Sequence, residues 1–157
     1  SVYRYCLRRL RARDAAEDAA AAIFERALVG LPDFAPRGSG SFRSWLFAIA
    51  HNTITNVERD RRFAIPLEDA VTVADGAPGP EDALQRAETN EEVWAMVASL
   101  PPLQQRVLEL RMADLSGREI AEVLGISHGA VKSAQFRAFT RLRESLGIAT
   151  VVQEAPL

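Results

Sequence analysis

Residues 115–142, LSGREIAEVLGISHGAVKSAQFRAFTRL, contain two helical patterns separated by one short turn. Ser116 precedes Glu119 by three residues, which is the capping-box arrangement found at the start of a helix. Gly125 supplies a tight turn after this helix, and Ser127 is suited to cap the next one. The pattern is typical of a helix-turn-helix, a motif whose second helix enters the major groove of DNA.

The second helix of this motif is predicted to have one buried and one exposed face. Its inward side follows helical spacing, through Val131, Gln135, Ala138 and Leu142. Its outward side combines two cations, hydroxyl groups and an aromatic ring, in Lys132, Ser133, Phe136, Arg137 and Thr140. Such a face is suited to phosphates and base edges. A plain helical hairpin with a solvated basic face is the competing interpretation.

Helical periodicity also dominates the first 62 residues. One helix is expected over residues 14–28, and Ser41 is a good cap for another that runs to about Arg62. A loop over residues 32–41 separates them. The apolar residues at helical spacing, which we expect to face inward, are Tyr3, Cys6, Leu7 and Leu10, then Ala16, Ala20, Ile23, Phe24, Ala27, Leu28 and Leu31, and finally Phe42, Trp45, Leu46, Ile49, Ala50, Ile54 and Val57.

Residues 63–80, FAIPLEDAVTVADGAPGP, have no sustained helical period and end in a Pro/Gly cluster, so they are interpreted as a linker. Beyond them, helices are expected over residues 80–100 and 102–112, and no stretch alternates with period two for long enough to form a sheet. The sequence therefore predicts an all-α protein of two small helical domains, residues 1–62 and 81–146, with a flexible acidic linker between them and a tail at 147–157. We expect the two domains not to share a core.

The composition is that of an ordinary soluble protein, with 157 residues of which 48% are hydrophobic and 25% charged. No apolar run approaches the roughly 20 residues that a membrane span needs. No signal segment is evident, although the start at Ser1 suggests a trimmed sequence. The single Cys6 cannot form an internal disulfide, which fits a reducing cytoplasm.

Several kinds of chemistry are disfavoured. The sequence has no evident nucleophile–base pair, phosphate-binding glycine loop or metal cluster, so we expect neither an enzyme nor a cofactor. His51 and His128 lie too far apart in sequence, and have too few partners, to suggest a metal site.

The net charge of −2 conceals an uneven distribution of charge along the chain. Residues 1–66 contain eleven arginines and seven acidic residues, whereas residues 67–105 contain one arginine and eight acidic residues. The helix-turn-helix is again basic. Two basic blocks around an acidic middle suggest nucleic acid as a partner.

Four stretches of this chain, taken in order, resemble the extracytoplasmic-function group of sigma-70-type bacterial sigma factors. They are AEDAAAAIFERAL at residues 16–28, GSFRSWLFAIAHN at residues 40–52, LPPLQQRVLELR at residues 100–111, and the helix-turn-helix. The resemblance covers residues 1 to about 146, and the order and spacing of the stretches make it highly specific.

This resemblance implies that residues 1–62 are sigma region 2. The helix at 14–28 would dock on the clamp helices of the RNA polymerase β′ subunit through acidic side chains, namely Glu17, Asp18 and Glu25. Residues 32–62 would recognise and melt the −10 element and capture an extruded base, whose Watson–Crick edge is exposed only after unstacking. The candidate contacts there are His51, Asn52, Asn56, Arg59, Arg62 and Arg37.

The resemblance further implies that residues 81–146 are sigma region 4, which would contact the polymerase β flap and read the −35 element. The candidate contacts with DNA are Lys132, Ser133, Phe136, Arg137 and Arg141. Core RNA polymerase, promoter DNA and an anti-sigma factor are the implied partners, with no membrane insertion. The acidic linker would pass through the polymerase cleft.

The chain departs from the family pattern at several positions. Ala21-Ala22 replaces Gln-Glu, His51 replaces Arg, and Asn56 replaces Asp. In the second helix of the motif the common Thr, Arg, Arg and Lys are replaced by Ala130, Ala134, Phe139 and Thr140. Losing about three cations predicts weaker phosphate binding with a flatter salt dependence, and Phe139 is a candidate contact for a partner protein.

Two alternatives to a sigma factor stay open at this point. One is a sigma-like decoy that sequesters an anti-sigma partner, and the other is a helix-turn-helix regulator that binds DNA without polymerase. The second would be expected to use a palindromic site with half-sites about one helical turn apart.

Overall fold

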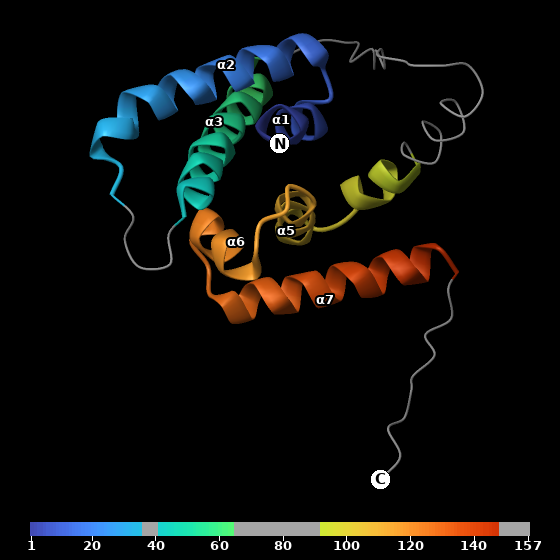
Figure 1. The fold of residues 1–157 in the computed structure, drawn as a ribbon. Coiled ribbons are helices and arrows are strands. Elements are labelled where there is room, and N and C mark those ends of the chain that lie inside the picture. The colour runs from blue at the N-terminus through green and yellow to red at the C-terminus, as the bar shows by residue number, and fades with distance from the viewer. Residues whose placement is uncertain (36–40, 65–91, 148–157) are drawn as a thin grey trace, which may run out of the picture.

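The computed structural model describes residues 1–35, 41–64 and 92–147, and within these ranges every regular element is a helix (Figure 1). The all-α class is therefore confirmed. The first half, residues 1–64, contains α1 (Val2–Leu10), α2 (Arg13–Gly30), the short 3-10 helix η1 (Leu31–Asp33) and α3 (Phe42–Ala64). The second half, residues 92–147, contains helical residues 92–98, α5 (Pro102–Met112), α6 (Gly117–Leu124) and α7 (His128–Ser145). Arg37, the expected linker beyond residue 64 and the tail beyond residue 147 lie outside the described residues.

The caps of α6 and α7 confirm the predicted helix-turn-helix. The Ser116 hydroxyl accepts a hydrogen bond from the Glu119 backbone N–H at 3.3 Å, and the Glu119 carboxylate accepts one from the Ser116 N–H at 2.8 Å. Gly125 then has a φ of 64°, in the left-handed region that glycine adopts at little cost. The Ser127 hydroxyl accepts a hydrogen bond from the Ala130 N–H at 3.1 Å and so caps α7.

The start of α3 is fixed by two serines that cap each other. The Ser41 hydroxyl accepts a hydrogen bond from the Ser44 backbone N–H at 3.0 Å, as expected for a capping residue. The Ser44 hydroxyl in turn accepts one from the Ser41 N–H at 3.1 Å. This reciprocal turn holds the first residues of α3 in one conformation.

The expectation that the two halves have separate cores is wrong. One contiguous cluster of buried side chains contains Tyr5 and Phe47 from the first half together with Val107, Leu110 and Ile120 from the second. Figure 1 shows the arrangement, with α5 beside α1 and α6 beside the N-terminal end of α3. Two blocks of about 60 residues each bury only a modest fraction of their surface when alone, so joining their apolar faces stabilises both.

The predicted apolar face of α2 is only partly correct. The helix buries its alanines and Ile23, but Phe24 is 50% exposed and Leu28 is 70% exposed. Leu31, just beyond the helix, is 46% exposed. The buried stripe consists of the small side chains of Ala16, Ala19, Ala20 and Ala27 together with Ile23, and α2 packs against both α1 and α3.

Other helices also bury some residues that differ from those predicted. In α1 the fully buried aromatic residue is Tyr5, while Tyr3 and Leu7 are exposed. In α3 the side chain of Phe47 is buried, whereas Phe42 is half exposed. In α7 Ala134 is buried and Gln135 is only half-buried.

We expect the substitution Leu110→Ala to lower the free energy of unfolding by about 2–5 kcal/mol, since Leu110 is fully buried. Because the core is shared, the loss should appear in the first half as well. Urea unfolding followed by the fluorescence of Trp45, in a Trp94→Phe background, measures this. The variant Leu146→Ala, at a position that is 55% exposed, is the control and should leave the midpoint unchanged. A Trp45 transition unaffected by Leu110→Ala would show that the halves unfold separately.

Candidate functional site

The outward face of α7 is exposed, as the sequence predicts. Lys132, Ser133, Phe136 and Arg137 are all solvent-accessible, and Phe136 is 73% exposed. The Arg137 Nε donates a hydrogen bond to the Ser133 carbonyl oxygen at 3.2 Å, so this guanidinium lies back along the helix. Arg141 is placed differently, because its Nη1 donates to Gln104 Oε1 of α5 at 3.4 Å. The four residues 132, 133, 136 and 137 therefore share one exposed face, the candidate reading face, and Arg141 lies at its edge.

Position 134 does not belong to this face. Ala134 is only 2% exposed and contributes to the core, so a cation at this position would have no solvated place in this fold. Ala134 is therefore a packing residue. Phe139, by contrast, is 46% exposed.

The candidate −10 residues on α3 divide into two groups. Asn52, Asn56 and Arg59 are exposed at intervals of four and three residues, so they share one side of the helix. Arg62 is also exposed, one turn further on. His51 does not join this stripe, because its ring turns toward α1, where the Tyr5 hydroxyl lies 3.3 Å from His51 Nδ1.

His51 belongs to a cluster of polar groups between the two halves. Burial, together with the positive charges of Arg9 and Arg106, lowers the pKa of His51 from 6.5 to about 4. The ring is therefore neutral at pH 7. A neutral, half-buried imidazole that contacts a tyrosine is suited to helix packing.

Arg9 is the centre of this cluster, and only 6% of its side chain is exposed. Its Nε donates to Glu58 Oε1 at 3.1 Å, and its Nη1 donates to Glu109 Oε2 at 3.3 Å. Gln105 Nε2 donates to the other Glu109 oxygen at 3.0 Å. Burial raises the pKa of Glu109, whose side chain is 2% exposed, while Arg9 opposes that shift. No local pattern in the sequence predicts this network, because Arg9 and Glu109 are 100 residues apart.

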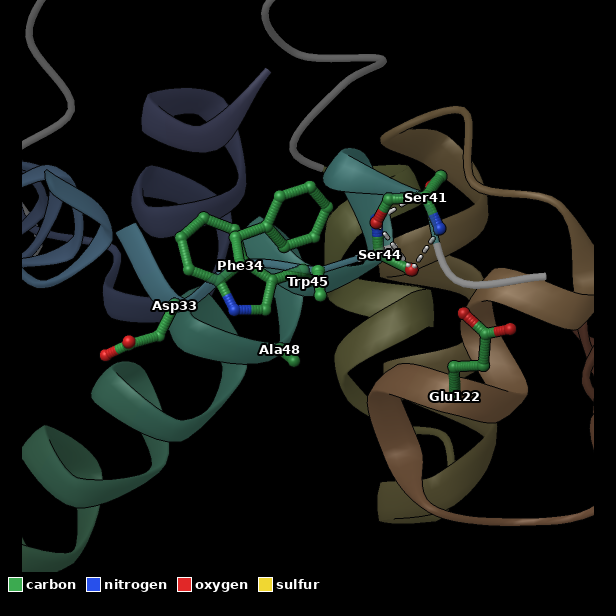
Figure 2. Close-up of a pocket in the computed structure, with 8 residues that line it drawn as sticks. Asp33, Phe34, Ser41, Ser44, Trp45, Ala48 and Glu122 are labelled. Atoms are coloured by element: carbon green, nitrogen blue, oxygen red, sulfur yellow. Dashed lines mark hydrogen bonds between the residues drawn. The ribbon is translucent and has the colours of Figure 1, made fainter. Parts of the chain in front are cut away.

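An aromatic pocket that the sequence does not predict lies at the start of α3. The rings of Phe34 and Trp45 have centroids 5.0 Å apart, and Phe42 packs against both. Gly30 allows the close approach of the indole, because a Cβ at this position would lie 3.2 Å from the Trp45 ring. The pocket has a volume of about 270 Å³ and is lined by Asp33, Phe34, Ala35, Ser41, Ser44, Trp45, Ala48 and Glu122 (Figure 2).

The surface of α2 carries the predicted acids. Glu17, Asp18 and Glu25 are all exposed. Phe24 and Leu28 are exposed on this helix too, although their helical spacing predicts that they face the core. The result is a mixed surface in which acidic groups border apolar side chains.

Within residues 1–35, 41–64 and 92–147, no group of three or more His, Cys, Asp or Glu side chains could hold a metal ion. Burial raises the pKa of the Cys6 thiol to about 11, so it is protonated at neutral pH. Among the described helices, none is long and apolar enough to cross a membrane.

Two family models match the chain, namely sigma-70 region 2 over residues 1–63 and sigma-70 region 4 over residues 90–142. The chain is 33% identical over 153 residues to the ECF RNA polymerase sigma factor ShbA of Streptomyces griseus, covering 89% of this chain and 78% of that protein. It is 34% identical over 150 residues to the RNA polymerase sigma factor YlaC of Bacillus subtilis, covering 92% and 85%. The solved structure of the sigma factor RpoE in complex with the anti-sigma factor NepR from Bartonella quintana has a TM-score of 0.70 and 21% identity, covering 94% of this chain and 90% of that one. At 21% identity, this structural similarity supports the fold of the chain and nothing beyond it.

We expect the free energy of unfolding to fall as the pH is lowered from 6.5 to about 4. In this range the unfolded chain binds a proton at His51 that the folded protein resists, so acid favours unfolding. The substitution His51→Asn removes the titrating group and should flatten this part of the stability curve. Thermal unfolding between pH 4 and pH 7 measures the slope. The variant Asn52→Ala, at the exposed neighbouring position, is the control and should keep the slope of the parent protein. An equal slope in all three proteins would contradict the assignment to His51.

Proposed function

The chain belongs to the extracytoplasmic-function group of the sigma-70 family, and from this premise we propose which of its surfaces carry each step of promoter recognition. The protein is a sigma factor that binds core RNA polymerase and directs transcription initiation at promoter DNA. Factors of this family perform no catalysis, since nucleotide addition belongs to the polymerase. A decoy, or a regulator that acts without polymerase, is not favoured, because the models for both sigma regions match the chain.

The observation that carries the proposal is the exposed face of the capped helix α7. Lys132 and Arg137 can each donate hydrogen bonds to phosphate or to a guanine edge, and Ser133 can donate or accept. Phe136 offers an apolar surface to a thymine methyl group. The cap by Ser127 directs the positive end of the helix dipole toward the DNA backbone. We assign these residues to the −35 element, with Arg141 at the edge of the contact.

The −10 element is assigned to α3 and the pocket at its start. Asn52, Asn56 and Arg59 offer amide and guanidinium groups on one side of the helix, and Arg62 extends the basic surface. Phe34 and Trp45 supply aromatic faces on which an unstacked base can lie. His51 supports this region through its contact with Tyr5. Arg37, which lies outside the described residues, remains a candidate contact for the same strand.

The polymerase contact is assigned to the exposed surface of α2. Glu17, Asp18 and Glu25 would pair with basic groups of the β′ clamp helices, and Phe24 and Leu28 would be buried in the interface. Acidic groups at a rim increase the rate of association, whereas buried aromatic and aliphatic side chains contribute most of the affinity. The second half of the chain would contact the β flap.

We further propose that the protein binds an anti-sigma factor and acts in the cytoplasm. The sigma factor RpoE, which shares this fold, was solved in complex with the anti-sigma factor NepR. Exposed apolar side chains such as Phe139, Leu103 and Leu146 on the second half offer contact area for such a partner.

We expect the double reversal Asp18→Lys and Glu25→Lys to weaken binding to core polymerase about tenfold or more, since like charges then oppose each other at the interface. Both side chains are exposed, so the circular dichroism spectrum should not change. Biolayer interferometry with core polymerase and no DNA measures the affinity. The matched control is Asp60→Lys on α3, where the carboxylate is 76% exposed. Undiminished affinity in the double variant would refute the assignment of α2.

We expect Lys132→Ala and Arg137→Ala each to cost about 1–3 kcal/mol in binding if the side chain reads a base, and to reduce discrimination of the −35 element. A side chain that touches only phosphate would instead give a uniform loss with a shallower salt dependence. Run-off transcription with core polymerase, on templates with intact and scrambled −35 elements, measures discrimination. Arg143→Ala near the end of α7 is the control. If both variants discriminate as well as the parent, α7 is not the reader.

A further inference from the structure

The C-terminal ends of α1 and α3 bring several arginine side chains together. Residues 1–13 contain five arginines and no acidic residue. Hydrogen bonds between α1 and α3 join residues 5 and 51, 9 and 58, and 10 and 61, so the two helices run side by side in the same direction (Figure 1). Their C-terminal ends, with the arginines that each of them carries, therefore lie next to each other.

Three of these arginines are exposed and form a surface that we call the arginine seam, namely Arg11, Arg61 and Arg62. The Arg61 Nη1 donates a hydrogen bond to the Leu10 carbonyl oxygen at 3.4 Å, which places this guanidinium at the end of α1, close to Arg11. Within residues 1–35, 41–64 and 92–147, none of the three guanidinium groups forms an ion pair with a carboxylate. The arginine seam is therefore a surface of uncompensated positive charge.

The acidic side chains nearest to the arginine seam already have partners. Glu58 accepts a hydrogen bond from Arg9, and Asp60 Oδ1 lies 3.8 Å from Arg59 Nε. The negative ends of the α1 and α3 dipoles stabilise cations at this place, so the cluster is compatible with a stable fold. Each dipole end carries only about half an elementary charge. The seam therefore keeps a positive potential that attracts a polyanion.

The neighbouring Arg8 does not belong to the arginine seam, because an aromatic ring covers it. The Cζ of Arg8 lies 5.1 Å from the centroid of the Trp94 ring, and its side chain is only half-exposed. Arg11 contacts the backbone of the same residue, with 3.4 Å between its Nη2 and the Trp94 carbonyl oxygen, yet it stays exposed. A polyanion can thus reach Arg11 without displacing the indole.

The arginine seam continues the side of α3 to which the −10 element is assigned. From Trp45 in the aromatic pocket to Arg62, the helix rises by about 25 Å, at roughly 1.5 Å per residue. Duplex DNA advances about 3.4 Å per base pair, so about seven nucleotides separate the pocket from the seam. DNA that leaves the melted element at this end of α3 passes the seam as a duplex, on its way to the −35 element.

We propose that the arginine seam binds the phosphate backbone of the duplex between the two promoter elements, where it adjoins the −10 element. The planar guanidinium groups of Arg11 and Arg61 can each donate two hydrogen bonds to one phosphate. Phosphates are the same in every sequence, so the seam holds the duplex without reading bases. It positions the DNA that enters the pocket, while α3 and α7 supply specificity. The placement of this duplex rests on the proposed assignment of α3 to the −10 element.

The test neutralises the two arginines of the seam that have no other assigned role. The double variant Arg11→Gln and Arg61→Gln removes both charges. A control double variant, Arg13→Gln and Arg143→Gln, removes the same charge from exposed positions outside the seam, and Arg13 is already paired with Glu17. A third variant, Arg11→Lys and Arg61→Lys, changes the side chains and keeps the charges.

All of these proteins also carry Lys132→Ala and Arg137→Ala, which remove the duplex contacts assigned to α7. Fluorescence anisotropy of the full-length chain with a labelled mixed-sequence duplex of about 20 base pairs, between roughly 50 and 200 mM salt, gives the affinity and its salt dependence. We expect the glutamine variant to bind about tenfold more weakly than the control at the lowest salt. The slope of log K against log salt should be smaller by about 1.8, since each lost phosphate contact removes about 0.9. The lysine variant should keep the slope of the control.

Equal affinity and equal salt slope in the glutamine variant and the control overturn the inference. An equal loss of slope in the lysine variant also overturns it, because the charges are still present there. A third contrary result is unchanged duplex affinity together with weaker binding to core polymerase in the absence of DNA. That result would assign the arginine seam to an acidic protein surface.

A separate measurement tests the −10 assignment on which the placement rests. Run-off transcription by the variant Asn52→Ala and Asn56→Ala compares templates with intact and scrambled −10 elements. Reduced discrimination supports the assignment of α3. Undiminished discrimination refutes that assignment and the placement of the duplex with it, whereas the anisotropy measurement decides by itself whether the seam binds phosphates.

Discussion

The guanidinium of Arg9 connects the two halves of the molecule, because its carboxylate partners lie on different halves. Glu58 belongs to α3, which shares the first half with Arg9, whereas Glu109 belongs to α5. The three charged side chains are largely removed from water. Separating the two halves would break the ion pair between Arg9 and Glu109. Removing one partner of such a buried set costs about 3–5 kcal/mol. The network therefore fixes how α5, and with it the helix-turn-helix, sits against α1 and α3.

This placement gives the three proposed functional surfaces different accessibility. The reading face of α7 and the acidic surface of α2 are exposed to solvent. The pocket at the start of α3 instead faces α6. The face of α7 that we assign to duplex DNA is thus exposed, whereas the pocket that we assign to a separated strand is partly walled by α6.

Local features of the fold could be predicted from the sequence, and long-range ones could not. The capping box of Ser116 and Glu119, the turn at Gly125 and the cap at Ser127 each depend on neighbours within four residues, so composition and spacing suffice. Helical spacing indicates the apolar stripe of a helix, but how much of that stripe is buried depends on the helices packed against it. Phe24 and Leu28 are therefore exposed although they follow the helical spacing. The side chains of the candidate site follow the same division. The exposed face of α7 follows from its own period, whereas the turn of His51 toward Tyr5 depends on contacts made 46 residues away.

The carboxylate of Glu119 serves two helices at once, since it accepts hydrogen bonds from the first residue of the α6 cap and from Ser41 at the start of α3. These hydrogen bonds, first that of Ser41, lower the pKa of Glu119 below its ordinary value of 4.5. The stabilisation that they provide is complete above that value and is lost only in stronger acid. Near neutral pH this junction between α3 and α6 is therefore insensitive to protons.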